Sequence, residues 1–288
     1  MFMSGADYRE SLRRYRPRVY VDGDAIEFVA DEPRLAPGVN AIALTYDYAL
    51  RSELEPVMTA RQHTSGRTVN RLLHVPTSNS DLLNKLEAVR VVCQETGCAE
   101  RYLAGDAFAG IFAATRRADA DAGTDYHQRF VSWMHEAQSE DLAIGIAMTD
   151  GKGDRSLRPH QQPNPDSYLH VVERRKDGIV LSGVKAIVTG APYVHELLVM
   201  PCRNMNEADA DFAVCCAVPV DAKGVTIVAR PAGRPGEPAA KFSARFGQST
   251  GVVLFDDVFV PWERVFLAGE WQHSGFLTTS YATHHRHT

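Results

Sequence analysis

The sequence predicts an α+β protein in which a helical part precedes a strand-rich part. Apolar residues recur at helical spacing in the first half of the 288-residue chain, β-rich runs with regular turn residues begin near residue 165, and helical spacing returns after Trp262. A chain of this length exceeds one small core. We therefore expect an N-terminal helical domain over 1–150, a β domain over 151–268 and the start of a C-terminal helical domain over 269–288.

The clearest predicted helix lies between Ser80 and Gly97. Its apolar residues recur at spacings of four, three and four residues and share one helix face: Leu82, Leu86, Val89 and Cys93. Ser80 or Asp81 suits the N-cap, and Gly97 ends the helix. Two further helical patterns follow over residues 99–117 and 126–148.

The strand-rich half opens with two β-rich runs joined by Lys176-Asp177-Gly178, which is typical of a hairpin turn. Three further runs follow at regular intervals, over residues 195–202, 212–231 and 250–261. Together they predict a compact antiparallel β domain of about 100 residues, with the proline-rich stretch 158–167 as its linker. Residues 185–192 resemble the first strand of a dinucleotide-binding fold, but the later glycines of that fingerprint are missing, so we reject that fold.

Charge, apolar run length and cysteine content argue against nucleic-acid, membrane and secreted classes of protein. The formal net charge of -5 gives no reason to expect a nucleic-acid partner. No apolar run reaches the length of a membrane span, and the first residues lack the apolar core of a secretion signal. The five cysteines are an odd number in a long chain, which favours a reducing compartment over a disulfide framework. We expect a cytoplasmic protein with no nucleic-acid or membrane partner.

Two short stretches carry the candidate chemistry. Cys98 and Tyr102 lie four residues apart, so a helix would place them on one face. Cys98 suits a nucleophile, a metal ligand or a small buried side chain, and spacing alone leaves all three open. The loop 147–155 combines glycines with positive charge, which suits a phosphate, a flavin edge or an ordinary turn. Thr189 ends a predicted strand, where its hydroxyl suits hydrogen bonding to a planar ring.

Several segments together resemble one flavoenzyme family. They are DYRESLRRYRPRVYVDGDAIE, AMTDGKGDR, GVKAIVTGAPYVHE and VVLFDDVFVPWERVF. Their order and spacing resemble the 4-hydroxyphenylacetate 3-hydroxylase family, which also contains 4-hydroxybutyryl-CoA dehydratase, over essentially the whole chain. The resemblance implies an acyl-CoA dehydrogenase-like architecture: an N-terminal helical domain, a middle antiparallel β-barrel and a C-terminal four-helix bundle. Of that bundle this chain would hold only the beginning, so the resemblance predicts a truncated bundle.

The resemblance also implies a cofactor. The family binds FAD or reduced FAD (FADH2) between barrel and bundle, usually in a homotetramer. Carried over by position, five residues would border the flavin: Met148, Thr149, Lys152, Arg155 and Thr189. Thr189 would hydrogen-bond the isoalloxazine ring, and a donor there stabilises negative charge on the reduced ring.

The two branches of the family differ at positions that this chain contains. The hydroxylase branch uses an arginine, a tyrosine and a histidine at positions held here by three apolar residues that cannot bind a phenol oxygen: Leu103, Ala107 and Ile146. The dehydratase branch holds an iron–sulfur cluster through two cysteines four residues apart, a histidine and a third cysteine. Cys98 matches the first cysteine and His285 the histidine, whereas Tyr102 stands at the second cysteine.

A complete four-iron cluster is not expected on this chain. The third cysteine would lie just beyond Thr288. At the flavin site, Thr250 stands where the family has a glutamate. Such a cluster needs four ligands, normally thiolates, and a phenol replaces a thiolate poorly. Cys98 and His285 would be metal ligands only if a cluster formed.

Three hypotheses follow. The first is a flavin-dependent oxidoreductase related to the dehydratase branch, acting on an acyl-CoA by hydrogen removal or double-bond isomerisation, with Cys98, Tyr102 and His285 as catalytic residues. The second is an FADH2-using monooxygenase of a phenolic acid, supplied by a separate flavin reductase. The third is a non-catalytic fragment or a subunit that needs a partner. Either enzyme would be a homo-oligomer.

Overall fold

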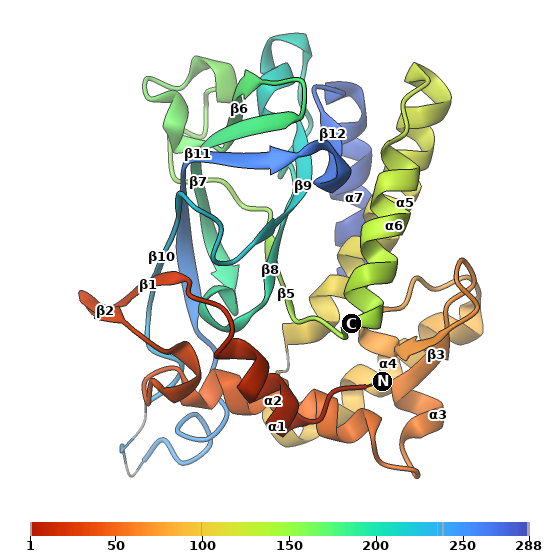
Figure 1. Ribbon diagram of the computed structural model, residues 1–288, viewed down its shortest axis with the longest axis vertical. Coiled ribbons are helices and arrows are strands. Elements are labelled where there is room, and N and C mark those ends of the chain that lie inside the picture. Colours follow the sequence, from red (N-terminus) through yellow and green to blue (C-terminus); the bar gives the residue numbers. More distant parts are fainter. Residues whose placement is uncertain (1, 99, 235, 238, 287–288) are drawn as a thin grey trace.

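The computed structural model describes residues 2–98, 100–234, 236–237 and 239–286, and it confirms the α+β class. Figure 1 shows strands in the upper left of the molecule and helices along its right side and its base. The α-helices are α1 Gly5–Leu12, α2 Ala36–Ala49, α3 Glu55–Met58, α4 Asn79–Thr96, α5 Leu103–Ala122, α6 Tyr126–Ser139 and α7 Ser274–Arg286.

The strands form two larger sheets and one small hairpin. A six-stranded sheet has the order β2–β1–β10–β11–β7–β6, and a four-stranded sheet has the order β12–β9–β8–β5. The bounds are β1 Arg18–Val21, β2 Asp24–Ile26, β3 Thr59–Arg61, β4 Thr68–Asn70, β5 Ile144–Ala147, β6 His170–Arg174, β7 Gly178–Thr189, β8 Glu196–Val199, β9 Val214–Pro219, β10 Val225–Ala229, β11 Thr250–Pro261 and β12 Val265–Ala268.

The expected closed antiparallel β-barrel is not what the described residues form. Both larger sheets are open, with β2 and β6 at the edges of one and β12 and β5 at the edges of the other. Within 151–268 every strand pair is antiparallel, as expected. Two strands from outside that range add parallel pairs, β1 with β10 and β5 with β8, which were not expected. Each parallel pair joins a strand that precedes residue 150 to one that follows it, which local sequence patterns do not indicate.

Helix α4 confirms the first predicted helix but not its details. The N-cap is Ser78, whose side chain accepts a hydrogen bond from the backbone N–H of Asp81, two residues before the predicted caps. Gly97 ends the helix at a φ of 73°, as expected. The buried face consists of Lys85, Ala88, Val89, Val92 and Thr96. Leu82 and Leu86 are only half-buried, so the buried face is rotated about the helix axis relative to the predicted face.

The other two predicted helices differ from their patterns in their bounds, and α5 extends past the expected end at Arg117 to Ala122. Helix α5 begins at Leu103, after a 3-10 turn over Glu100–Tyr102, rather than at Ala99, which lies outside the described residues. The pattern over 126–148 divides into α6 and β5, separated by Asp141 at a φ of 52°. Helix α7 confirms the helical spacing after Trp262, and it packs closely against α5, because a Cβ on Gly110 would lie 3.1 Å from the Tyr281 backbone nitrogen.

The strand-rich half matches its local predictions. Strands β6 and β7 form the expected antiparallel hairpin around residues 175–177. The proline-rich linker contains two 3-10 turns, Pro159–Gln161 and Pro165–Ser167.

The largest buried apolar cluster draws on α2, α5, β7 and β11 together. The division into domains at 150 and 268 stays a prediction. None of the described helices is long and apolar enough to cross a membrane.

Candidate functional site

Cys98 and Tyr102 are neighbours in the connection that joins α4 to α5. The Cys98 sulfur lies 3.9 Å from the Tyr102 hydroxyl oxygen. The nearby Cys93 thiol and burial raise the pKa of Cys98, and burial together with Cys98 raises the pKa of Tyr102. Both groups are therefore neutral at neutral pH, which makes Cys98 a weak nucleophile and Tyr102 a hydrogen-bond donor rather than a base.

Helix α7 brings His285 to the same place. The His285 and Tyr102 rings are nearly parallel, at 13°, with centroids 6.1 Å apart, and the Tyr281 ring lies 5.8 Å from His285 at 9°. The structure thus brings together all three residues that the sequence predicts as catalytic: Cys98, Tyr102 and His285. Their catalytic roles stay a prediction.

Two buried charged residues that the sequence patterns missed lie beside His285. Asp106 of α5 is fully buried, and its Oδ2 lies 3.3 Å from Nδ1 of His285. Its Oδ1 pairs with Nζ of Lys85, which is 3% exposed on α4. A carboxylate in this position orients an imidazole and determines which ring nitrogen carries the hydrogen. The sequence contains one indication of these two residues: each is a charged residue that interrupts an apolar helical pattern.

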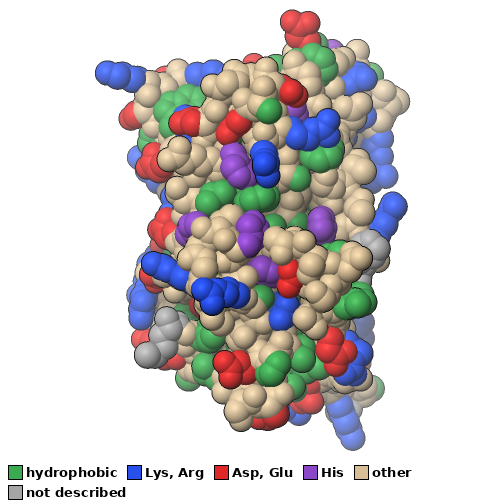
Figure 2. Space-filling view, turned by 90° about the vertical axis from the view of Figure 1, so that its right-hand side faces the viewer, with side chains coloured by type: hydrophobic (Ala, Val, Ile, Leu, Met, Phe, Trp, Pro, Cys, Tyr) green, Lys and Arg blue, Asp and Glu red, His purple; other side chains and the backbone are tan. Residues whose placement is uncertain are grey.

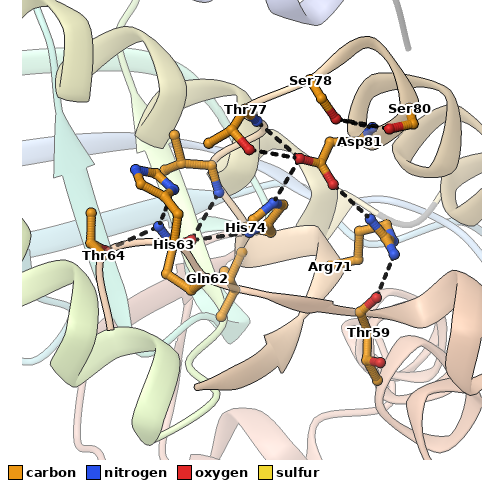
Figure 3. A network of polar contacts seen from close by, with 12 residues as sticks. Thr59, Gln62, His63, Thr64, Arg71, His74, Thr77, Ser78, Ser80 and Asp81 are labelled. Carbon is orange, nitrogen blue, oxygen red and sulfur yellow. Dashed lines mark hydrogen bonds and ion pairs between the residues drawn. The ribbon is translucent and has the colours of Figure 1, made fainter. Parts of the chain in front are cut away.

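A polar network at the start of α4 supports the two helices that carry this site (Figure 3). Asp81 Oδ2 accepts hydrogen bonds from the backbone N–H and the hydroxyl of Thr77, at 3.0 Å each. The same carboxylate faces the buried side chains of His74 and Arg71, at 3.6 and 3.8 Å. Helix α5 touches this segment directly, because a Cβ on Gly105 would lie 2.8 Å from the Leu72 carbonyl oxygen.

Glu100 connects the cysteine site to the strand that ends at Thr189. Glu100 is 5% exposed, and its Oε2 would lie 2.6 Å from a Cβ on Gly190. The Tyr193 hydroxyl donates to Glu100 Oε1 at 3.4 Å and accepts from the Ser249 N–H at 2.8 Å. Burial raises the pKa of Glu100 well above its usual range, so the buried group is a neutral acid.

The glycine-containing loop borders a surface pocket of about 340 Å³. Three of the predicted flavin residues line it: Thr149, Lys152 and Arg155. Met148 is not among the residues that line the pocket, and its carbonyl oxygen accepts from Lys185 Nζ at 2.9 Å. Thr189 is half-buried at the end of β7, opposite Thr250 of β11 and two residues beyond Ile187, which lines the pocket.

Asp150, which lines the pocket, belongs to a buried ion pair that sequence reasoning missed. Lys185, 2% exposed, pairs with Asp150 Oδ1 at 2.6 Å and also donates to the Met148 and Met200 carbonyls. The buried ammonium thus has one ionic partner and two carbonyl acceptors. The Cys202 thiol donates to Asp150 Oδ2 at 3.0 Å. A lysine inside the apolar strand 183–189 was the signal for this pair.

Histidines gather on the face of the molecule that Figure 2 shows, which is the helical side of Figure 1. His127 and His135 of α6 bond to the hydroxyls of Thr115 and Thr64, at 3.1 and 2.8 Å. In the part of the chain that the structure describes, no group of three or more His, Cys, Asp or Glu side chains is placed to hold a metal ion.

The family relationship follows from a comparison with family models. Residues 4–267 match the model described as 4-hydroxyphenylacetate 3-hydroxylase N terminal. The chain belongs to this family. The match includes the Cys98 connection, the pocket loop and Thr189, and it ends before His285.

Relatives from both branches of the family match the chain. It is 38% identical over 99% of its length to 4-hydroxybutyryl-CoA dehydratase/vinylacetyl-CoA-Delta-isomerase of Clostridium aminobutyricum, covering 60% of that protein. It is 29% identical over 92% of its length to the oxygenase component of 4-hydroxyphenylacetate 3-monooxygenase of Geobacillus sp. (strain PA-9), covering 55%. The solved archaeal 4-hydroxybutyryl-CoA dehydratase of N. maritimus superposes on 99% of the chain with a TM-score of 0.93, at 36% identity and with 58% of its own length covered. The chain thus spans less than two thirds of these relatives.

The residues present fit the family's flavin better than an iron–sulfur cluster. The pocket offers an apolar side chain, Ile187, beside the cationic Lys152 and Arg155, which suits a flat ring joined to phosphates. At the cysteine site, the described donors are the thiols of Cys98 and its neighbour Cys93, a phenol and an imidazole. A four-iron cluster needs four ligands that are normally thiolates, and this set does not suit it.

Proposed function

We propose that this chain is part of a flavin-dependent enzyme that acts on an acyl-CoA, by removing hydrogens next to the carbonyl or by moving a double bond. The observation that carries the proposal is the contact of Glu100 with Gly190, which joins the Cys98–Tyr102–His285 group to the strand end at Thr189. The identity of 38% to the dehydratase, against 29% to the monooxygenase, supports an acyl-CoA over a phenol.

FAD or FADH2 would be held by Met148, Thr149, Lys152, Arg155 and Thr189. A bound flavin supplies hydride and electron transfer. Lys152 and Arg155 provide positive charge for its phosphates, and the Thr189 hydroxyl donates a hydrogen bond to its ring. The acyl-CoA dehydrogenase-like architecture, a homo-oligomer and a cytoplasmic location belong to the same proposal.

Proton transfer falls to the residues around Cys98. Asp106 holds the hydrogen of His285 on Nδ1, so Nε2 is the basic nitrogen that takes a proton from the carbon next to the carbonyl. The neutral Tyr102 phenol donates a hydrogen bond to the oxygen on which charge develops. No step uses a four-iron cluster, and Cys98 and His285 do not act as metal ligands.

Two other functions are favoured by particular observations. Relatives named as oxygenase components support an FADH2-using monooxygenase of a phenolic acid with a separate flavin reductase. The apolar side chains at its expected polar positions, Leu103, Ala107 and Ile146, count against it. The chain covers 60% of the dehydratase, and the third hypothesis is a fragment or a subunit that needs a partner.

Spectroscopy of the flavin-loaded protein separates these functions. Crotonyl-CoA is expected to perturb the flavin absorption bands, whereas 4-hydroxyphenylacetate with FADH2 is expected to cause no oxygen uptake beyond flavin autoxidation. Hydroxylated product would establish the monooxygenase instead. Failure to bind FAD in either redox state would establish the fragment.

A further inference from the structure

Ile187 has a backbone conformation that its residue type strongly disfavours. Four described residues other than glycine have positive φ, and three of them are aspartates: Asp22, Asp141 and Asp257. Aspartate tolerates the left-handed region, whereas a β-branched side chain is a genuine outlier there. Ile187 has a φ of 57°, and such a conformation persists only where the surrounding structure enforces it.

A β-bulge enforces this conformation. Val188 pairs with Gly251 and Lys185 with Val253, so Ala186 and Ile187 both lie opposite Val252. The left-handed position of a bulge commonly holds glycine. The bulge is also tied to the pocket loop, since the Ala186 N–H donates to the Thr149 carbonyl at 2.8 Å.

The bulge points the Ile187 side chain outward, and burial does not offset the strain. Ile187 is 57% exposed, whereas its neighbours Lys185, Ala186 and Val188 are buried. The exposed side chain lines the same pocket as Lys152 and Arg155. Strain and exposure are both unfavourable for the chain alone, and a ligand that covers the side chain recovers the apolar burial.

We propose that Ile187 is a cofactor-contact residue, whose side chain forms the apolar wall against which the flat ring of a flavin lies. This inference rests on the proposed flavin function. The strained bulge presents the side chain in the ligand-free chain, so little rearrangement accompanies binding. Glycine at position 187 would relax the backbone, which raises the stability of the flavin-free chain. It would also remove the apolar wall, which lowers the affinity for flavin.

The test compares Ile187→Gly with Val228→Gly. Val228 is a matched control because it is β-branched, 48% exposed on the same sheet and lies on β10, outside the pocket. FAD affinity is measured by fluorescence titration, and the midpoint of thermal unfolding is measured without flavin. Ile187→Asn is a second variant, since asparagine tolerates positive φ but offers no apolar wall.

Ile187→Gly is expected to weaken FAD binding about tenfold and to raise the unfolding midpoint by about 2–4 °C. Val228→Gly is expected to lower the midpoint and to leave FAD affinity unchanged, because glycine weakens a regular strand. Ile187→Asn should weaken FAD binding like Ile187→Gly. Unchanged affinity in both Ile187 variants, or a midpoint lowered by Ile187→Gly as by Val228→Gly, would overturn the inference while leaving the proposed function intact. Absence of FAD binding by the wild type would overturn the proposed function itself.

Discussion

The Asp106 carboxylate lies 3.3 Å from Nδ1 of His285 and pairs through its other oxygen with Lys85. A buried carboxylate can only accept hydrogen bonds when ionised, so it places the imidazole hydrogen on Nδ1. Helix α7 is thereby linked to a charge pair between α4 and α5. The arrangement orients His285 through buried side chains, whereas the His285 side chain itself is 44% exposed.

Removing Asp106 should destabilise the chain strongly. Asp106→Asn leaves the Lys85 ammonium buried without its counter-charge, which costs about 3–5 kcal/mol of unfolding free energy. Urea unfolding followed by circular dichroism measures this loss. The double variant Lys85→Met, Asp106→Leu is expected to be more stable than either single charge deletion. Additive losses in the double variant would show that the two charges do not depend on each other.

Replacing Glu100 should change how stability depends on pH. Burial raises the pKa of Glu100 above its ordinary value of 4.5, so the folded chain keeps the proton while the unfolded chain loses it. The stability contribution is complete below pH 4.5 and is lost as the pH rises. Glu100→Gln, which stays neutral, should therefore be more stable than the wild type at pH 8 and equally stable at pH 4. Lower stability of Glu100→Gln at pH 8 would contradict the neutral buried acid.

His195 should make the stability of the chain depend on pH in the opposite direction to Glu100. Burial lowers its pKa to about 3, and its two ring nitrogens bond to the Ser11 hydroxyl and the Ala143 N–H. The unfolded chain takes up a proton near pH 6.5, so stability is complete above that pH and falls by about 1.4 kcal/mol per unit toward pH 3. Urea titrations at pH 7 and pH 5 should show a smaller loss for His195→Gln than for the wild type. Equal losses would mean that His195 does not titrate differently on folding.

Flavin should protect Cys202 from alkylation. Cys202 lines the pocket, and burial raises its pKa, so labelling by N-ethylmaleimide is slow and best measured near pH 8.5. FAD at ten times its dissociation constant should slow labelling about tenfold, as read by peptide mass spectrometry. Cys215 and Cys216 are fully buried and serve as internal controls. Labelling at the same rate with and without bound FAD would place the flavin elsewhere.

Features with a local cause could be predicted from the sequence. The hairpin before Gly178 follows from its turn residues, and the end of α4 follows from the left-handed Gly97. The short distance between the Cys98 and Tyr102 side chains also follows from their spacing in the sequence, even though a 3-10 turn replaces the expected helix there.

Features that depend on distant partners could not be predicted. The parallel pairing of β1 with β10 joins residues about 200 positions apart, and no pattern inside either strand specifies its partner. The buried face of α4 includes Lys85 because Asp106 on another helix neutralises it, which hydrophobic spacing does not reveal. The strain at Ile187 likewise depends on its register against β11.

The most direct test of the account is to quantify flavin, iron and acid-labile sulfide in one anaerobically purified sample of this chain, reconstituted with FAD. We predict bound flavin, with iron and sulfide far below the amount of a four-iron cluster. Iron and sulfide at one cluster per chain, or no bound flavin, would contradict the central claim of a flavin site without a cluster.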